Sequence, residues 1–394
     1  MVKRFERAYR QLNDQQRRAV DKIDGPVLVV AGPGTGKTQL LSMRVANILR
    51  QTDAKPSNIL ALTYTNKAAV NMKDRIIQLD SRGGPRVNAS TFHSFAAEIM
   101  NLYPDSFWSG ARLSIAPDST QLDIVESIVS KLPLDNPLAL KFAGQYTLLK
   151  DIQSSINLAK DAGLTPDKLR ALIDVNLAYI DEIEARLAAI CAKRLNIKNL
   201  PDLKKSVGDL PEQGIDWTVY PLTSLSAAIK DSLAVAAQAD LGTRRTINTG
   251  RWKNRWVQVI NGQPGLHKER DRNNWWRHIA DVYDNYRGEL HRRGYYDYSD
   301  MLVEVIAQLE ADTDMLADTQ ERFTHVLIDE FQDTTPAQIR LSHLVSTHFS
   351  TEGRPNLMVV GDDDQTIFKF NGAEVNNMLN FEKQYPSVKK VVLT

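Results

Sequence analysis

The chain has 394 residues, 42% of them apolar, which is enough for two or three domains that each bury a hydrophobic core. Its 49 basic and 48 acidic side chains almost cancel, so the net charge neither indicates nor excludes a nucleic-acid partner, because basic surface can be local. The single cysteine, Cys191, excludes internal disulfides and a cysteine-rich zinc site, and it fits a reducing compartment. No run approaches the roughly 20 apolar residues that span a bilayer, and the first residues lack the apolar core of a signal peptide. We therefore expect a cytoplasmic protein without a membrane partner.

The first predicted elements with a chemical meaning are a strand, a glycine-rich loop and a helix. Val27 to Val30 is apolar and rich in β-branched residues, as in a buried parallel strand. The loop "AGPGTGKT" follows, and "TQLLSMRVANILR" then shows helical spacing. This is the context of a Walker A loop, although its first position is Ala31 instead of glycine. N–H groups of the loop and of the helix start would face an anion, and Gly34 and Gly36 would adopt positive φ.

The loop therefore predicts a site for nucleotide phosphates. Lys37 would reach the β and γ phosphates, and the Thr38 hydroxyl would bind Mg²⁺. A glycine-rich turn with an incidental lysine is the alternative, which the flanking strand and helix disfavour. The predicted phosphate-binding residues are Ala31, Gly32, Pro33, Gly34, Thr35, Gly36, Lys37 and Thr38.

Two later strands end in acidic residues. "THVLIDEFQD" places Asp329 and Glu330 directly after the apolar run Val326 to Ile328. Alone, such an acidic pair has a structural role as often as a functional one. Together with a phosphate loop, it predicts that Asp329 would hold Mg²⁺ and Glu330 would activate the attacking water. "LMVVGDDDQTIF" ends another strand, Leu357 to Val360, in three aspartates, and this is the sheet edge at which α/β folds bind ligands. Gln365 could sense the γ-phosphate or position water there; the alternative for the acidic run is a solvated turn.

A large insertion separates the two halves of this site, because Lys37 and Asp329 are 292 positions apart. Residues 104–293 carry helical patterns and few strand-like runs. We predict an α/β fold, a parallel P-loop sheet flanked by helices, formed by residues 1–103 and 294–394, with a mostly helical domain inserted at 104–293. Within the insertion, turn-forming residues make 201–265 the expected loop or linker region.

The last part of the insertion is basic. Residues 243–293 contain twelve Lys and Arg against five Asp and Glu. Arginines interleaved with aromatic rings suit nucleic-acid binding through phosphate contacts and stacking. The alternative, which we favour slightly, is a pair of helices with tryptophans in the core and arginines in solvent. Four of the six tryptophans lie here: Trp252, Trp256, Trp275 and Trp276.

Seven segments together resemble the motif series of the UvrD/Rep-type superfamily 1 DNA helicases, in the family's order and across residues 12–374. They are "LNDQQRRAV", "AGPGTGKT", "ILALTYTNKAAVNMKDRI", "STFHSFAAEIM", "YDYSDML", "LIDEFQDTT" and "VVGDDDQTIFKFNGAE". The resemblance implies a RecA-like fold for the α/β part. It also implies that Gln16 reads adenine, for which an amide has the matching donor and acceptor, so that ATP is preferred over GTP.

The resemblance also implies DNA-contacting residues. Those of the third segment are Thr63, Tyr64, Thr65 and Asn66, and those of the fourth are Thr91, Phe92, His93 and Ser94. Hydroxyl and amide groups can donate to phosphate, and Tyr64 can stack on a base; His93 could instead be a core histidine. Asp297 and Tyr298 match the motif at which the chain re-enters the first domain. Phe370 would stack on a base. Asn371 replaces a family arginine, and Lys369, two positions away, could supply the missing charge.

As a whole, the resemblance implies an ATP-dependent helicase that uses Mg²⁺ and moves 3′ to 5′ on single-stranded DNA toward duplex junctions. The family's next motif and its second RecA-like domain, which supplies arginines to the γ-phosphate, do not follow Val391 to Thr394. We therefore expect the N-terminal half of a helicase, with weak binding and slow turnover on its own. The alternative is a non-catalytic ATP- and DNA-binding regulatory module, and a nuclease domain elsewhere in the protein is a third possibility.

Overall fold

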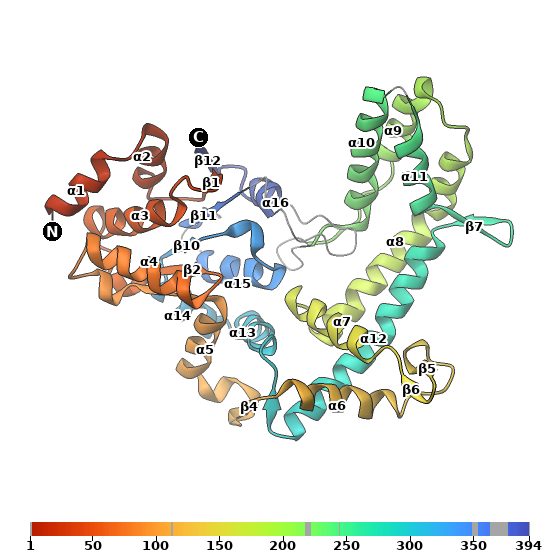
Figure 1. Ribbon diagram of the computed structural model, residues 1–394, viewed down its shortest axis with the longest axis horizontal. Helices are drawn as coiled ribbons and strands as arrows, with labels where there is room; N and C mark the ends of the chain where they lie inside the picture. Colours follow the sequence, from red (N-terminus) through yellow and green to blue (C-terminus); the bar gives the residue numbers. More distant parts are fainter. Residues whose placement is uncertain are drawn as a thin grey trace.

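The computed structural model describes residues 2–111, 113–216, 222–243, 245–348, 354–362 and 377–393. An α/β part and a helical part lie side by side (Figure 1). Among the described residues, no helix is both long enough and apolar enough to cross a bilayer.

The α/β part is built on one six-stranded sheet in the order β12-β1-β11-β10-β2-β3, with every neighbouring pair parallel. Three strands precede the insertion and three follow it, so two distant parts of the chain interleave in one sheet. Four of the strands are buried along their whole length, as expected for parallel strands covered on both faces. The strands are β1 Val27–Ala31, β2 Ile59–Thr63, β3 Asn88–Thr91, β10 His325–Ile328, β11 Leu357–Gly361 and β12 Lys389–Leu393.

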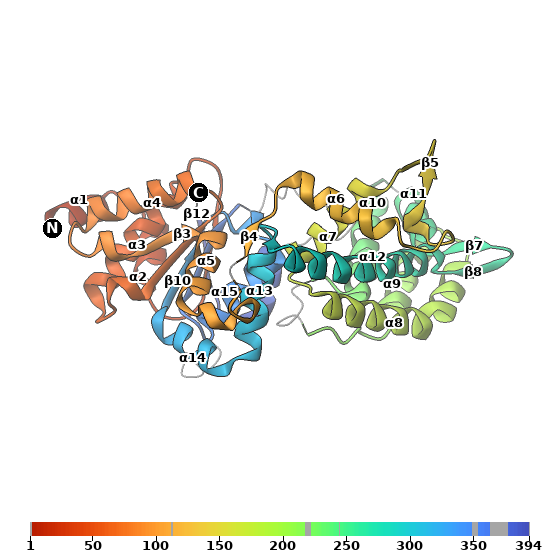
Figure 2. The same cartoon turned by 90° about the horizontal axis from the view of Figure 1, so that it is seen from below.

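Helices cover both faces of this sheet (Figure 2). Alternate strand residues point to opposite faces, so Val27 and Val29 join one core whereas Leu28 and Val30 join the other. The first face carries α1 Val2–Arg10, α2 Asp14–Asp21, α3 Lys37–Gln51 and α4 Asn66–Leu79. The second carries α5 Phe92–Leu102, α13 Asp300–Ala311, α14 Thr313–Arg322, α15 Pro336–Ser346 and α16 Asn377–Gln384. This arrangement confirms the predicted α/β fold class.

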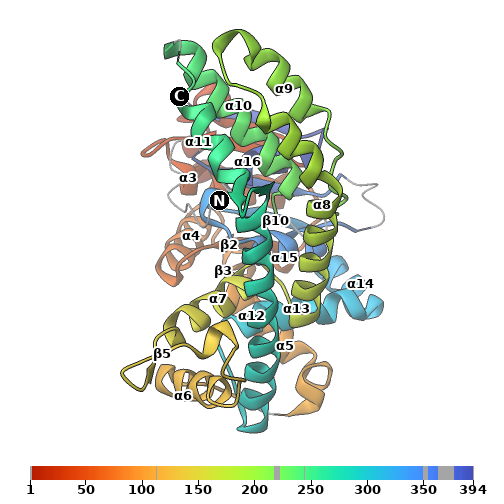
Figure 3. The same ribbon diagram turned by 90° about the vertical axis from the view of Figure 1, so that its right-hand side faces the viewer.

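The inserted part is mostly helical, also as predicted, and two long helices run along each other through it (Figure 3). Its apolar residues form two further cores, one toward each end. The helices are α6 Asp118–Val129, α7 Leu149–Asp161, α8 Pro166–Ala192, α9 Leu200–Gly208, α10 Leu225–Thr243, α11 Ile247–Trp256 and α12 His267–Arg292. The hairpins are β5 Lys141–Phe142 with β6 Gln145–Tyr146, and β7 Gln258–Ile260 with β8 Gln263–Gly265.

The chain leaves and re-enters the α/β part through a short parallel pair, β4 Ser114–Ile115 with β9 Tyr295–Tyr296. Division of the chain into domains at 1–103, 104–293 and 294–394 stays a proposal. Short 3₁₀-helices connect the larger elements: η1 Pro56–Asn58, η2 Gly84–Arg86, η3 Pro104–Ser106, η4 Trp108–Gly110, η5 Pro137–Ala139, η6 Ile197–Asn199 and η7 Phe331–Asp333.

The prediction of a loop or linker at 201–265 is wrong, because α9, α10, α11 and a hairpin occupy most of it. Several of its turn-forming residues lie where an element begins or where two elements meet. Pro201 is in the first turn of α9, where the missing N–H costs nothing. Asn261 and Gly262, with φ of 52° and 76°, make the two-residue turn between β7 and β8. The pattern is therefore that of a helical region with tight turns.

Two of the four tryptophans of the basic stretch are core residues. Trp252 and Trp256 are buried, and their indole N–H groups donate to the Ser232 hydroxyl at 3.1 and 3.2 Å. Trp275 and Trp276 are partly buried against the neighbouring core of the insertion. For Trp252 and Trp256 the core interpretation holds, whereas Arg251 and Arg255 of the same helix are exposed.

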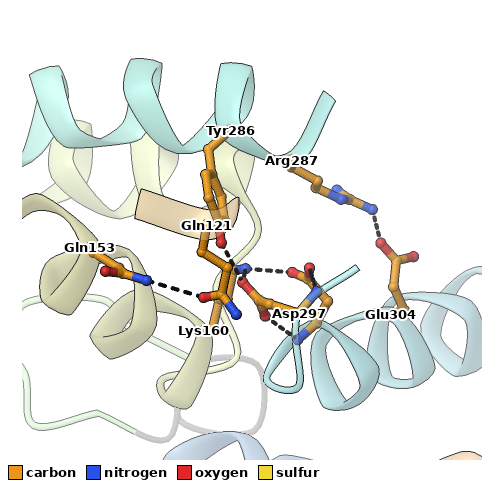
Figure 4. A network of polar contacts seen from close by, with 8 residues as sticks. Gln121, Gln153, Lys160, Tyr286, Arg287, Asp297 and Glu304 are labelled. Carbon is orange, nitrogen blue, oxygen red and sulfur yellow. Dashed lines mark hydrogen bonds and ion pairs between the residues drawn. The ribbon is translucent and has the colours of Figure 1, made fainter. Parts of the chain in front are cut away.

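A buried lysine joins the insertion to the α/β part (Figure 4). Lys160 of α7 binds Asp297, and its Nζ lies 2.6 Å from Asp300 Oδ1, with all three side chains almost without solvent contact. The Tyr286 hydroxyl of α12 donates to Asp297 Oδ2 at 3.2 Å, and the Tyr283 ring lies 5.4 Å from Nζ. One cation therefore holds together α7, α12 and the start of α13.

We expect Lys160→Met to lower the free energy of unfolding by about 3–5 kcal/mol, because it leaves two buried carboxylates without their cation. Equilibrium urea denaturation followed by circular dichroism measures this change. The matched control is Arg170→Met, which removes an arginine paired at the surface with Asp281 and Asp284 and should cost no more than about 1 kcal/mol. Equal losses in the two variants would show that the buried cluster does not hold the parts together.

Candidate functional site

The phosphate loop has the geometry expected from its sequence. It connects the carboxyl end of β1 to α3, which begins at Lys37. Gly34 and Gly36 have φ of 78° and 81°, the left-handed conformation that favours glycine. Gly36 is the N-cap of α3, and no side chain caps this helix start. The N–H groups of its first turn therefore face outward to the loop and are suited to hold an anion.

The predicted carboxylates lie at the same edge of the sheet. Asp329 and Glu330 follow β10, which β11 separates from β1. Lys37 Nζ donates to Glu330 Oε2 at 2.6 Å, and Thr38 Oγ1 donates to Asp329 Oδ2 at 3.2 Å. The structure thus brings together four residues predicted from two segments about three hundred positions apart along the chain.

The electrostatics of the two carboxylates suit a site that receives a cation. Burial, with a smaller contribution from the charge of Glu330, raises the pKa of Asp329 to about 6. A divalent cation beside Asp329 would stabilise its charged form. Hard oxygen donors such as the Asp329 carboxylate and the Thr38 hydroxyl are the ligands that Mg²⁺ prefers, so these residues fit the ion. Glu330 has φ of 50°, a strained backbone for a residue with a side chain, and such strain gathers at functional sites.

The sequence analysis missed Gln332, which connects the carboxylates to β11. Its Nε2 donates to Glu330 Oε2 at 2.9 Å, and its Oε1 accepts from the Asp362 backbone N–H at 3.0 Å. A Cβ at Gly361 would lie 2.6 Å from that Oε1, so glycine is needed beside it. Asn377 binds the same turn, because its amide donates to the carbonyls of Phe331 at 3.1 Å and Thr334 at 2.9 Å. The sequence could have indicated Gln332 by one feature, an amide side chain two positions after Glu330 on the turn that follows β10.

Gln16 lies beside the phosphate loop. Its Nε2 donates to the Thr35 carbonyl at 3.2 Å, and its Oε1 accepts from the Asn13 backbone N–H at 3.0 Å. The residue predicted to read a base is therefore next to the residues predicted to bind phosphate.

The residues predicted to contact DNA follow β2 and β3 along the same edge. Tyr64 is 57% exposed, and Asn66 is also exposed at the start of α4. The Thr65 and Thr91 hydroxyls accept backbone N–H bonds as the N-caps of α4 and α5. Thr63 is buried, and its hydroxyl finds no hydrogen-bond partner in the described part of the chain. Tyr64, Thr65 and Asn66 are thus the exposed members of the first group, with the Thr65 hydroxyl already accepting a backbone N–H.

His93 is half-buried and stacks on Tyr298, with ring centroids 4.1 Å apart. Burial lowers the pKa of His93 to about 4, so the ring is neutral at physiological pH. Tyr298 is 52% exposed. The pair joins the fourth motif to the re-entry motif at the surface. The remaining predicted residues, Gln365 and Phe370, lie outside the described residues.

A cavity of about 710 Å³ lies between the α/β part and the insertion. Tyr64 and Thr335 line it from one side, whereas Leu158, Arg255 and Trp276 line it from the other. Its size is that of a typical ligand site. The accessible aromatic ring after β2 and an exposed arginine of the basic stretch thus face the same space.

Comparison with known proteins agrees with this geometry. The family model for the UvrD/REP helicase N-terminal domain matches residues 12–386. A curated ATP-dependent DNA helicase PcrA of Staphylococcus epidermidis is 27% identical over 384 residues, which cover 98% of this chain and 37% of the relative. A PcrA of Staphylococcus aureus strain Mu50 is 26% identical over 382 residues, which cover 97% of this chain and 37% of the relative. This chain therefore spans a little over a third of the length of these relatives, and it belongs to the UvrD/REP helicase N-terminal domain family.

Proposed function

We propose that this chain binds Mg·ATP and single-stranded DNA along the carboxyl edge of its sheet, as the N-terminal half of an ATP-dependent 3′–5′ DNA helicase that acts at duplex junctions. The observation that carries the proposal is the convergence of Lys37 on Glu330 and of Thr38 on Asp329. A phosphate-binding lysine, a carboxylate able to act as base and two hard oxygen donors are the parts that ATP hydrolysis requires. Membership of the helicase family and the helicase names of the relatives support it.

In this proposal the loop residues bind the phosphates and Gln16 binds adenine. Thr38 and Asp329 would hold Mg²⁺, which when bound neutralises charge on the phosphates. Lys37 would leave Glu330 for the β and γ phosphates. Glu330, still held by the Gln332 amide at 2.9 Å, would then accept a proton from the attacking water. Gln365 would assist at the γ-phosphate.

For DNA, the proposal assigns phosphate contacts to Thr63, Thr65, Asn66 and Thr91, and ring contacts to Tyr64, His93 and Phe370. Sequence-tolerant binding of single strands needs stacking faces beside donors to phosphate. The exposed ring of Tyr64 and the His93–Tyr298 stack supply such faces. Movement along the strand would follow from closing and opening against a second RecA-like domain, which the family resemblance implies.

Turnover by residues 1–394 alone should be slow. In the family resemblance, arginines of a second RecA-like domain stabilise the γ-phosphate, and such arginines contribute about 10³–10⁵ to the rate. A non-catalytic binding module is the competing function, and the ordered contact between Gln332 and Glu330 argues against it, because a module that only binds has no use for an oriented base.

Glu330→Gln should bind Mg·ATP at least as tightly as the unaltered chain, because Lys37 loses its competing carboxylate. Its ATP turnover should stay at background with and without single-stranded DNA. Binding of a fluorescent ATP analogue and release of phosphate measure the two effects. Glu310→Gln is the matched control, since Glu310 is paired with Lys168 and Arg340 away from the phosphate loop.

Weaker ATP binding in Glu330→Gln than in Glu310→Gln would contradict the competition between phosphate and Glu330 for Lys37. Fast DNA-stimulated turnover by the unaltered chain would overturn the proposal that it is catalytically incomplete. Should that turnover persist in Glu330→Gln, the assignment of the base would be wrong.

Tyr64→Ala should weaken binding of single-stranded oligonucleotides by about 1–3 kcal/mol, the usual contribution of one stacked base. Fluorescence anisotropy with labelled oligothymidine measures this loss. Val70→Ala is the control, because Val70 is equally exposed on α4 but lies beyond the sheet edge. Indistinguishable affinities for the two variants would remove Tyr64 from the DNA site.

The three basic residues of α11, of which two are exposed and Lys253 is half-buried, provide a separate test of the basic stretch. Reversing Arg251, Lys253 and Arg255 to glutamate should lower the slope of log affinity against log salt by about two, if each neutralises one phosphate of a single strand. Reversal of Arg4, Arg7 and Arg10 on α1 is the matched control. An unchanged slope in the α11 variant, or equal changes in both, would leave only the tryptophan-core interpretation of this stretch.

A further inference from the structure

The short helix α2, which carries Gln16, is fixed at both of its ends. At the start, Asn13 and Gln16 form a reciprocal capping box, with Gln16 N–H to Asn13 Oδ1 at 2.8 Å and Asn13 N–H to Gln16 Oε1 at 3.0 Å. Because Oε1 accepts a backbone N–H, the Gln16 amide can have only one orientation. Its Nε2 therefore faces the Thr35 carbonyl of the phosphate loop.

The other end of α2 is held by Arg44, a residue of α3. The guanidinium donates to the carbonyls of Ala19 at 2.7 Å, Ile23 at 2.9 Å and Lys22. Asn47, one turn further along α3, donates to the Val20 carbonyl at 3.1 Å. The carbonyls of Ala19, Val20 and Lys22 belong to the helix end, which leaves such groups without intrahelical partners, and Ile23 follows directly. Arg44 thus takes the place of a C-terminal cap for α2.

Arg44 is an unusual residue for this position, because its side chain is 2% exposed and it makes no carboxylate contact within salt-bridge distance among the described residues. Burial lowers its pKa to about 10, which leaves it charged at neutral pH. The nearby charge of Asp24 acts in the opposite direction to burial, and the negative end of the α2 dipole also favours the charged form. The planar fork of the arginine reaches the three carbonyls from two nitrogens, whereas a lysine would have to reach them from a single nitrogen.

The consequence is a rigid link between two helices with different predicted tasks. α3 begins at the phosphate-binding Lys37, and α2 presents the base-reading Gln16. Both amide atoms of Gln16 keep one unused hydrogen-bond position, since Nε2 has a second hydrogen and Oε1 a second lone pair. A donor and an acceptor side by side match the N7 and N6 edge of adenine. Whether that edge is reached depends on where α2 lies relative to the phosphate loop.

We infer that Arg44 is a positioning residue for base selectivity: it fixes α2 against α3 so that Gln16 can read adenine on a nucleotide whose phosphates lie in the loop. This inference rests on the proposed ATP-binding function. It assigns the phosphates to the loop alone and the choice of base to the joint action of Gln16 and Arg44.

The test measures binding of Mg²⁺ complexes of ATP, GTP and inorganic tripolyphosphate to the 394-residue chain by isothermal titration calorimetry. The unaltered chain should prefer ATP over GTP by about tenfold, the discrimination expected of one amide pairing with a base edge. Gln16→Ala and Arg44→Met should both bring this ratio close to one. Tripolyphosphate, which has no base, should bind to all three chains equally. Arg287→Met is the control, because it removes a different arginine, which is partly buried and paired with Glu304 at the joint of the insertion, and it should keep the ratio.

Each of the other outcomes contradicts either the role of Arg44, base reading by Gln16, or the proposed function. A preserved ratio in Arg44→Met together with a lost ratio in Gln16→Ala would overturn the role of Arg44 and leave the proposed function intact. Loss of tripolyphosphate binding in Arg44→Met would show that Arg44 acts on the phosphate loop instead. A ratio unchanged in Gln16→Ala would overturn base reading and this inference with it, and a chain that binds neither ATP nor tripolyphosphate would overturn the proposed function itself.

Two further variants guard against a chain that fails to fold. Arg44→Lys keeps the charge but reaches fewer carbonyls, and Asn47→Ala removes only the second contact to the same helix end. Both should lower the ratio of ATP to GTP affinity part of the way while thermal unfolding remains cooperative. Full retention of the ratio in both variants would overturn the inference even if Arg44→Met proved insoluble.

Discussion

Because all six strands of the sheet run parallel, their carboxyl ends share one edge, and this brings Lys37 within 2.6 Å of Glu330 although 293 positions separate them along the chain. Everything else at the site depends on that shared edge. The insertion between β3 and β10 is tolerated because it leaves and returns through one short pair of strands and forms cores of its own. The buried Lys160 then fixes the point at which the chain re-enters the α/β part, since Asp297 lies just before α13 and Asp300 begins it.

Three of the six strands, β1, β10 and β11, were predicted because buried parallel strands are short apolar runs such as Val326 to Ile328. β3 is polar and mostly half-buried, so it lacks this pattern. The phosphate loop was predictable because its chemistry needs glycine, lysine and threonine at fixed spacing. Arg44, Lys160 and Gln332 could not be found in the same way. Each is a polar residue of a type that usually lies at the surface. The hydrogen bonds and ion pairs that give each its role reach residues distant in the sequence. Several of these partners are backbone groups, which no sequence pattern indicates.

The failed linker prediction at 201–265 has a related cause. Proline, asparagine and glycine mark positions where the backbone turns or a helix begins, and they do so equally in a loop and in a bundle of short helices. Pro201 starts α9, and Asn261 with Gly262 turns a hairpin. A loop and a bundle of short helices differ in whether the residues between the turns are buried, as Trp252 and Trp256 are. An isolated tryptophan in a basic stretch does not indicate such burial in the sequence.

The same edge also separates two kinds of phosphate contact by how its helices begin. α3, α4 and α5 are the elements that follow β1, β2 and β3 through short loops or none, so three positive helix ends point to one side. The start of α3 has glycine as its N-cap and leaves its N–H groups to a phosphate, which suits firm binding of a nucleotide. The starts of α4 and α5 are already capped by Thr65 and Thr91, so each hydroxyl can offer a phosphate no more than its single hydrogen. Under the proposed function, phosphates of a DNA strand there would be held by single, exchangeable contacts, which would suit movement along the strand, whereas the nucleotide would have to stay in place until it reacts.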